Sequence, residues 1–228
     1  MTSLPLPERG PQPAIFYVTD RHRIPSSSPT DILAKIRNAV IAGVDFVQIR
    51  EKDLATRELA SLTRQVLHII KQSDAPARVI VNDRLDVALA VDAAGVHLGR
   101  ESLPAKEAVH WCRGENAPPG FLIGVSCHSV EQALAAEKAG ASYVFFGPVF
   151  DTPSKRSFGP PQSLSLLEDV GRAAKIPVIA IGGVNELTAA DCIRSGAAGI
   201  AAIRMFQEIE DKDSLLAQLA EIHRIPLV

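Results

Sequence analysis

The sequence predicts an α/β fold, a single (β/α)8 TIM barrel, from two recurring patterns. A helical stretch that ends in a small residue and Gly recurs before an apolar, β-rich run, at 41–50, 93–100, 138–147 and 195–204. Further apolar runs of strand length lie between these repeats, at 14–20, 78–83, 121–127 and 177–183. Such runs are typical of parallel strands that are covered on both faces.

The alternation of these elements narrows the topology. About eight strands alternate with about eight helices over the 228 residues, which is the pattern of a barrel or of an open doubly wound sheet. The spacing is regular, and no G-x-G-x-x-G motif follows the first strand. Both features favour the barrel over the open sheet. We expect one domain over residues 1–228, with a Pro-rich N-terminal extension at 1–13.

Capping residues predict where the helices begin and end. The Gly past each helix is expected to be left-handed, a conformation that costs Gly no Cβ penalty. Residues 31–43 carry apolar side chains at three- and four-residue spacing, which predicts a helix before the second strand. Ser129 and Gln132 have the spacing of a capping box and predict the start of another helix.

The composition excludes several classes of function. The net charge is -2, and Lys and Arg are spread along the chain without the basic block of a nucleic-acid binder. No apolar run reaches membrane-spanning length, and the first residues lack the apolar stretch of a signal peptide. We therefore expect a soluble cytoplasmic protein. Cys112, Cys127 and Cys192 have no C-x-x-C spacing and are predicted to be reduced thiols.

Polar residues gather where the predicted strands end. The strand interiors are Val, Ile, Phe and Ala, but the ends are polar, cationic or glycine. A packed core explains the interiors and not the ends, and the active site of a barrel forms at the C-terminal ends of its strands. The ends in question are Gln48 to Lys52, Asn82 to Arg84, His97 to Arg100, Ser126 to His128, and Gly182 with Gly183.

The stretch Gln48 to Lys52 is the most informative of these ends. Strand alternation directs Gln48, Arg50 and Lys52 to one face and Ile49 and Glu51 to the other. A salt-bridged rim is one interpretation. The other is an anion site, because an Arg fork can clamp phosphate oxygens and a Lys adds a point charge.

The remaining ends leave alternatives open. Asn82 and Asp83 could cap a helix, or Asp83 could hold Mg²⁺ beside a diphosphate. His97 and His128, each taken alone, are more often structural than catalytic. Gly182 and Gly183 predict either a tight turn or a phosphate cradle of backbone N–H groups.

The loop GPVFDTPSKRSFGPP at 147–161 places hydroxyls and cations between prolines. Thr152, Ser154 and Lys155 are predicted to fold over phosphate groups as a lid, with the prolines reducing the entropy that closure costs. Together with Arg50, Lys52 and the glycines, the predicted site suits two phosphate-bearing groups and a divalent cation.

These residues resemble a known family. The motifs QIREKD, VNDR, VHLGRE, GVSCHS, GPVFDTPSK, IPVIAIGG and GAAGIAAI resemble thiamine phosphate synthase and its paralogue, the TenI-type thiazole tautomerase, in the same order over about residues 14 to 207. The resemblance implies a (β/α)8 barrel. It also implies a reaction in which hydroxymethylpyrimidine diphosphate loses diphosphate, through a pyrimidine carbocation, and is attacked by hydroxyethylthiazole phosphate with the help of Mg²⁺. A homo-oligomer is compatible with the sequence, and no partner protein is implied.

The resemblance also assigns roles to residues. It implies that the pyrimidine diphosphate is bound by Gln48, Ile49, Arg50, Glu51, Lys52, Asn82, Ser126 and Lys155. It implies that the thiazole phosphate is bound by Thr152, Pro153, Ser154, Gly183, Ile203 and Arg204. The metal positions are Asp83 and Ser102, and the expected catalytic residues are Arg50, Lys52, Lys155, Ser126 and His128.

Three positions depart from the family pattern. Ser102 stands where the synthases usually have a second metal-binding Asp, Ser154 replaces a Thr of the lid, and Arg204 replaces a Ser. The tautomerase is therefore an alternative, with no metal and with His128 as acid and base, because imidazole titrates near working pH. A non-catalytic protein that binds thiazole phosphate is a second alternative.

Overall fold

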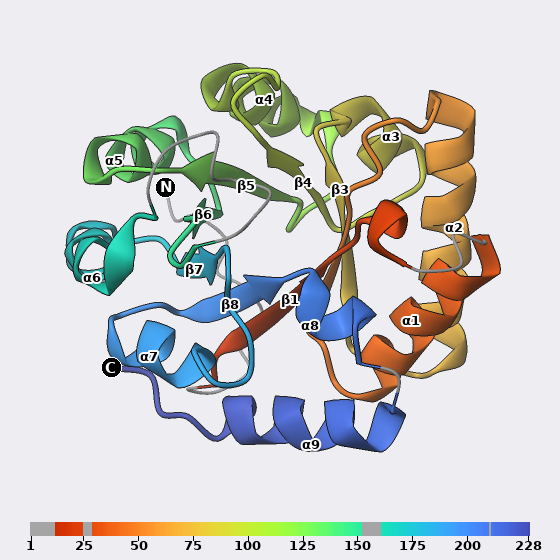
Figure 1. The fold of residues 1–228 in the computed structure, drawn as a ribbon. Coiled ribbons are helices and arrows are strands. Elements are labelled where there is room, and N and C mark those ends of the chain that lie inside the picture. Colours follow the sequence, from red (N-terminus) through yellow and green to blue (C-terminus); the bar gives the residue numbers. More distant parts are fainter. Residues whose placement is uncertain (1–11, 25–28, 152–160, 210) are drawn as a thin grey trace.

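The computed structural model describes residues 12–24, 29–151, 161–209 and 211–228. These residues form a closed barrel of eight parallel strands, in which each strand pairs with its sequence neighbours and β1 pairs with β8 (Figure 1). The predicted TIM barrel is confirmed, and each predicted strand run contains one strand. The strands are β1 (Ala14–Val18), β2 (Phe46–Ile49), β3 (Arg78–Asn82), β4 (Gly95–Leu98), β5 (Leu122–Cys127), β6 (Tyr143–Phe146), β7 (Val178–Ile181) and β8 (Gly199–Ala202).

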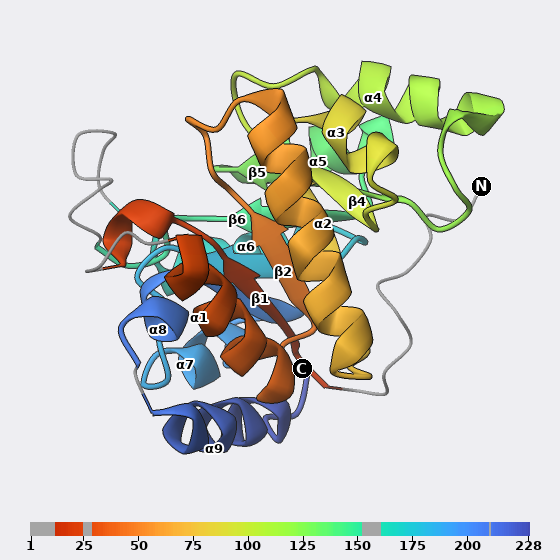
Figure 2. The same ribbon diagram turned by 90° about the vertical axis from the view of Figure 1, so that its right-hand side faces the viewer.

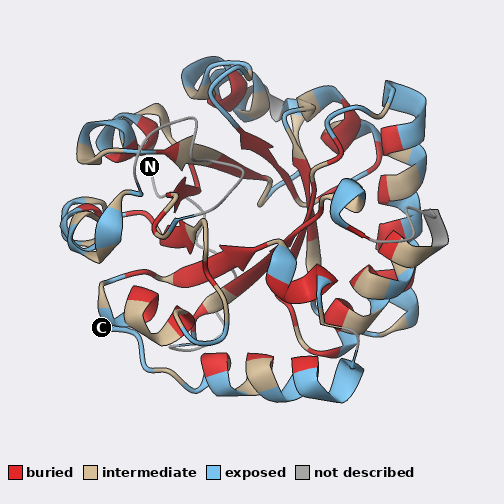
Figure 3. Cartoon of the chain, viewed as in Figure 1, coloured by how far each residue is buried: buried red, intermediate tan, exposed pale blue. Residues whose placement is uncertain are grey.

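Helices surround the barrel, and Figure 2 shows α1 and α2 covering β1 and β2. The strands are buried and the outer helix faces are exposed (Figure 3). In the described residues the helices are α1 (Pro29–Ile41), α2 (Thr56–Gln72), α3 (Leu85–Ala90), α4 (Ala105–Trp111), α5 (Val130–Ala139), α6 (Ser163–Ala173), α7 (Ala189–Arg194), α8 (Arg204–Gln207) and α9 (Lys212–His223), with a 3-10 turn η1 (Arg21–Arg23) and a π-helical turn η2 (Cys112–Asn116). Among the described helices, none is long and apolar enough to cross a membrane.

The predicted glycine caps form at three of the four repeats. Gly43, Gly140 and Gly196 have φ of 99°, 95° and 86°. The prediction is wrong at Gly95, which lies inside β4, where a Cβ would approach a backbone carbonyl of the neighbouring strand to 2.3 Å. The left-handed residue of that turn is Asp92, with φ of 56°. Gly95 is therefore required for close strand packing and not for the helix end.

The predicted capping box at α5 forms only in part. The Ser129 hydroxyl accepts a hydrogen bond from the Gln132 backbone N–H at 3.3 Å. The Gln132 side chain, however, accepts from the His128 N–H at 2.8 Å and not from Ser129. The backbone of His128 is therefore tied to the first turn of α5.

Aromatic side chains fill the barrel interior below the strand ends. The rings of Phe16 and Phe46 stack with centroids 4.3 Å apart, and Phe145 meets Phe16 edge-on at 5.1 Å. Tyr143 belongs to the same buried cluster. The filled interior is the floor on which a cavity at the C-terminal ends of the strands rests.

The N-terminal ends of the strands are held by a buried carboxylate. Asp45 Oδ2 accepts a hydrogen bond from the Ile15 N–H at 2.9 Å and lies 3.2 Å from His223 Nε2 on α9. The contact joins β1, the residue before β2 and the last helix at the base of the barrel.

Candidate active site

A cavity of about 380 Å³ opens at the C-terminal ends of the strands. Charged and polar side chains, apolar side chains and glycines all contribute to its lining. Among the described residues the lining includes Val18, Asp20, Arg23, Gln48, Arg50, Lys52, Asn82, His97, Ser126, Cys127, His128, Phe145, Gly147, Pro148, Ile181, Gly182, Gly183, Val184, Ala201, Ala202, Ile203 and Arg204. The cavity brings together the expected residues of the second, third, fifth, seventh and eighth strand ends.

Gln48 leaves a buried acceptor at the cavity. The residue is 1% exposed, and its Nε2 donates to Asn82 Oδ1 at 3.0 Å. Its Oε1 is buried and has no hydrogen-bond partner among the described residues. Buried polar atoms are nearly always paired in folded proteins, and an orphan on a cavity wall points to a ligand donor.

A buried hydrogen-bond chain ends at Ser126. His97 Nδ1 lies 3.3 Å from the Tyr143 hydroxyl, and His97 Nε2 lies 2.9 Å from Ser126 Oγ. Burial lowers the pKa of His97 to about 3 and raises the pKa of Tyr143 far above its usual value, so the imidazole is neutral and the phenol protonated. If Tyr143 donates to Nδ1, the Nε2–H donates to Ser126 and the Ser126 O–H is free to donate into the cavity.

A glycine makes room for this chain. A Cβ at Gly124 would lie 2.2 Å from the Tyr143 ring and 2.6 Å from His97 Nδ1. Only glycine fits at this point of β5, because the two rings occupy the space of a side chain.

The strand alternation predicted for 48–52 is confirmed. Gln48, Arg50 and Lys52 line the cavity, while Ile49 is buried in the core outside the barrel. Glu51 also points away and binds Arg21. The Ile49 and Glu51 side chains therefore do not line the cavity that the resemblance assigns to the pyrimidine diphosphate.

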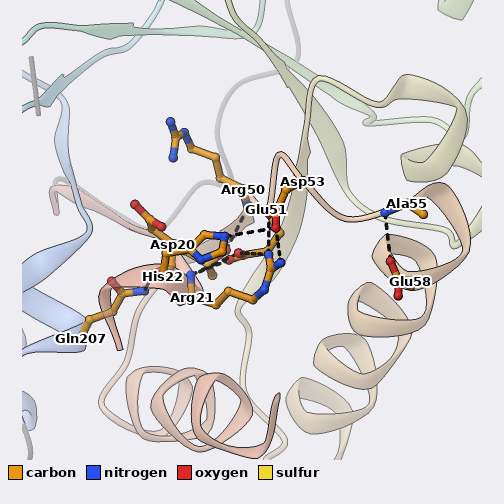
Figure 4. A network of polar contacts seen from close by, with 10 residues as sticks. Asp20, Arg21, His22, Arg50, Glu51, Asp53, Ala55, Glu58 and Gln207 are labelled. Atoms are coloured by element: carbon orange, nitrogen blue, oxygen red, sulfur yellow. Dashed lines mark hydrogen bonds and ion pairs between the residues drawn. The ribbon is translucent and has the colours of Figure 1, made fainter. Parts of the chain in front are cut away.

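A salt-bridged rim does exist, but among the described residues it involves Glu51 and not Arg50 or Lys52. Arg21 Nη1 donates to Glu51 Oε2 at 3.0 Å, and Arg21 also pairs with Asp53 (Figure 4). The hydrogen bond from Arg21 lowers the pKa of Asp53 to about 2. Arg50 points away from this cluster in Figure 4, and its backbone N–H donates to Thr19 Oγ1 at 2.9 Å.

Asp20 and Arg23 line the cavity and were missed by the sequence analysis. A signal was present, because the run from Asp20 to Arg23 follows the first strand just as polar runs follow the others.

The opposite wall is shaped by two glycines. Gly182 and Gly183 have φ of 93° and 72°. A Cβ would lie 2.5 Å from Pro148 at the first and 2.6 Å from the Phe150 Cβ at the second. Glycine is therefore needed for both conformation and space. Ile203 and Arg204 line the same cavity, and the phosphate cradle remains a prediction.

His128 is exposed and lines the cavity. Its Nδ1 donates to the Gly147 carbonyl oxygen. A carbonyl can only accept, so Nε2 is the nitrogen left to exchange a proton when the ring is neutral.

Comparisons with known proteins agree on one family. The family model described as "Thiamine monophosphate synthase" matches residues 15–206. The chain belongs to this family. It is 40% identical over 200 residues to a thiamine-phosphate synthase of Roseiflexus sp. strain RS-1, covering 88% of this chain and 80% of the relative. It is 42% identical over 189 residues to the thiamine-phosphate synthase of Methanoculleus marisnigri, covering 83% and 85%. The solved thiamine phosphate pyrophosphorylase of Pyrococcus furiosus superposes with a TM-score of 0.78 at 34% identity, covering 92% of this chain and 94% of that one.

The described residues offer few ligands at the metal site that is expected from the thiamine monophosphate synthase family. Asp83 is exposed, has φ of 68°, and is not among the described residues that line the cavity. Ser102 Oγ accepts a hydrogen bond from the Gly99 N–H at 2.7 Å. The described residues hold no group of three or more His, Cys, Asp or Glu side chains that could bind a metal. One carboxylate suits Mg²⁺ only if substrate oxygens and waters supply most of the ligands, which is common for this ion.

The predicted lid lies outside the described residues. Thr152, Pro153, Ser154 and Lys155 all belong to the segment 152–160. Their roles therefore remain the predictions that the family resemblance gives.

Proposed function

We propose that this chain joins hydroxymethylpyrimidine diphosphate to hydroxyethylthiazole phosphate, giving thiamine phosphate and diphosphate. Family membership and the names of the relatives support the activity. The observation that supports it at this site is the hydrogen-bonded pair of buried Gln48 and half-buried Asn82 in the cavity that Arg50 and Lys52 also line.

The amide pair suits the pyrimidine. No described residue donates to Gln48 Oε1, and Asn82 uses its Oδ1 for Gln48, which leaves its NH₂ to donate. An acceptor beside a donor matches the exocyclic amino group and the adjacent ring nitrogen of an aminopyrimidine. A substrate that fills this position would satisfy the orphan oxygen.

In the proposed reaction these residues stabilise the charge of the leaving group and hold the two substrates in line. In the proposed dissociative route, the bond from the methylene carbon to the diphosphate breaks before the thiazole nitrogen attacks that carbon. Arg50 and Lys52 stabilise the negative charge that grows on the departing diphosphate, and the Ser126 hydroxyl donates to one of its oxygens. The glycine wall holds the thiazole phosphate in line with the methylene, which lowers the entropy cost of the second step.

We propose that Asp83 contributes to Mg²⁺ binding, with Ser102 as the weaker second position. When bound, the ion would supply positive charge beside the diphosphate. The chain itself supplies one carboxylate on a tight turn: the Asp83 N–H donates to the His97 carbonyl at 2.8 Å. Asn tolerates positive φ about as well as Asp, so Asp83→Asn removes the charge without new strain.

The test is thiamine phosphate formation from both substrates over a Mg²⁺ titration. We expect Mg²⁺-dependent turnover that Asp83→Asn largely removes. Ser102→Asp should lower the Mg²⁺ concentration for half-maximal rate, because a second carboxylate strengthens binding of a dication. Ser102→Ala is the matched control and should change this concentration little.

A different outcome would favour the tautomerase alternative. No thiamine phosphate at any Mg²⁺ concentration, together with deuterium exchange into the thiazole substrate that His128→Asn abolishes, would contradict the synthase proposal.

A further inference from the structure

The end of β1 carries a charged segment, Asp20–Arg23, that has no role in the proposed reaction so far. Its residues divide by direction. Asp20 and Arg23 line the cavity, whereas Arg21 and His22 contact the loop after β2. The segment therefore has one face on the cavity and one on the rim.

The outward face of the segment is held to the loop after β2 by hydrogen bonds and ion pairs. The Arg21 backbone N–H lies 3.2 and 3.1 Å from the two carboxylate oxygens of Glu51, and Arg21 Nη1 donates to Asp53 Oδ1 at 2.7 Å. The Glu51 side chain is 1% exposed, so its charge is sheltered and its partner matters. On the other side, Gln207 Nε2 donates to the Asp20 carbonyl at 3.0 Å (Figure 4).

The inward face offers a cation. Arg23 Nε donates to Asp20 Oδ2 at 3.0 Å, and in the described part of the chain no hydrogen bond uses its two Nη atoms. Those atoms keep the forked donor geometry that fits phosphate oxygens. The Arg23 side chain is 37% exposed, and an exposed pair with Asp20 contributes little to stability. Stability alone therefore gives no reason for an Arg here.

The cavity around Arg23 favours an anion. Arg50, Lys52 and Arg204 line the same cavity, and Asp20 is the one carboxylate among its described lining residues. β1 stands between β2 and β8, so the segment that carries Arg23 follows a strand whose neighbours lead to Arg50 and Arg204.

We propose that Arg23 binds a phosphate group of a substrate and that Glu51 is a positioning residue, which holds Arg23 at the cavity wall through Arg21. This assignment replaces direct contact of the Glu51 side chain with the pyrimidine diphosphate. It rests on the proposed function for the identity of the anion, which is either the diphosphate or the thiazole phosphate.

Steady-state kinetics of Arg23→Ala test the first part. We expect the KM of one substrate to rise about tenfold, equivalent to about 1.4 kcal/mol, with kcat changed less than about threefold. The substrate whose KM rises is the one that Arg23 contacts, and Arg23→Lys should recover part of the loss. The matched control is Arg172→Ala, an exposed arginine on α6 that pairs with Glu168. Unchanged KM values for both substrates would overturn the assignment of Arg23.

A double-mutant cycle tests the positioning role. Glu51→Gln keeps the size and an acceptor oxygen but removes the charge that holds Arg21. It should raise the same KM by about three- to fivefold, and the double variant with Arg23→Ala should be no worse than Arg23→Ala alone. Glu168→Gln is the control for loss of a glutamate charge. Fully additive effects, or a rise in the KM of the other substrate, would show that Glu51 does not act through Arg23.

A binding experiment separates failure of this proposal from failure of the proposed function. If the wild-type protein makes no thiamine phosphate, inorganic diphosphate and inorganic phosphate are each titrated calorimetrically into wild type and Arg23→Ala. Weaker binding of either anion to the variant by about tenfold supports the phosphate site. Equal affinity of the two proteins for both anions overturns it.

Discussion

At the mouth of the barrel Gln48 presents a buried oxygen that has no hydrogen-bond partner in the described part of the chain, whereas at the base Asp45 binds the Ile15 N–H and contacts His223. Both residues belong to the same stretch of chain, three positions apart, at opposite ends of β2. The mouth holds polar groups that a ligand would satisfy, and the base holds polar groups that the fold satisfies.

The difference separates function from stability along the strands. In barrels of this kind, residues at the C-terminal ends of the strands serve chemistry and those at the N-terminal ends serve stability. Substitutions at the mouth should therefore lower activity and leave stability unchanged, whereas substitutions at the base should lower stability and leave activity unchanged. The following predictions test that separation, from the largest expected effect to the smallest.

Gln48→Met should damage activity and spare the fold. Methionine fills a similar volume but cannot accept from the pyrimidine, so kcat/KM should fall by about 100-fold. The melting temperature should stay the same or rise, because the buried unpaired oxygen is gone. Turnover and thermal unfolding of the same preparation measure both. A loss of stability with normal turnover would place Gln48 among the structural residues.

Asp45→Ala should do the reverse. It leaves the buried Ile15 N–H without its carboxylate partner, which costs about 2–3 kcal/mol of unfolding free energy. The kcat of the folded fraction should stay within about twofold of wild type. Chemical denaturation gives the free energy, and His223→Ala is the milder companion, expected to cost about 1 kcal/mol. A fall in kcat that matches the loss of stability would mean that the two ends are not separable.

His97, which lies between Tyr143 of the filled interior and Ser126 at the mouth, predicts a pH effect on stability. Burial lowers its pKa to about 3, below the usual value of about 6.5 in an unfolded chain. Between these two pH values the unfolded state therefore binds one more proton than the folded state. The contribution of His97 to the free energy of unfolding is full above pH 6.5 and falls as the pH is lowered, by up to about 1.4 kcal/mol per pH unit. Denaturation of wild type and His97→Gln at pH 7.5 and pH 5 measures the difference. Equal pH slopes in the two proteins would show that His97 is not kept neutral by the fold.

The fold was predictable because its signals are local. The apolar runs and their polar ends located each strand, and the alternation at 48–52 correctly separated Gln48, Arg50 and Lys52 from Ile49 and Glu51. Period-two geometry needs no knowledge of the rest of the chain.

The features that the sequence did not predict depend on contacts between segments far apart in the chain. Gly95 is glycine because of a neighbouring strand and not because of a helix end. The partner of Glu51 is Arg21, thirty positions earlier, and no local pattern pairs them. Arg23 lies two residues beyond Arg21 and lines the cavity, which the sequence of the segment alone does not indicate. The role of Glu51 therefore follows from the three-dimensional structure and not from its motif.

Hydrogen exchange with and without product tests the separation of mouth and base most directly. Thiamine phosphate and diphosphate are added together with Mg²⁺, and protection is followed by mass spectrometry. We expect slower exchange in peptides that contain residues 48–52, 82–84, 126–128 and 182–184, with no change in those around Ile15 and His223. Protection confined to the base, or none at the mouth with saturating product, would contradict the assignment of the site.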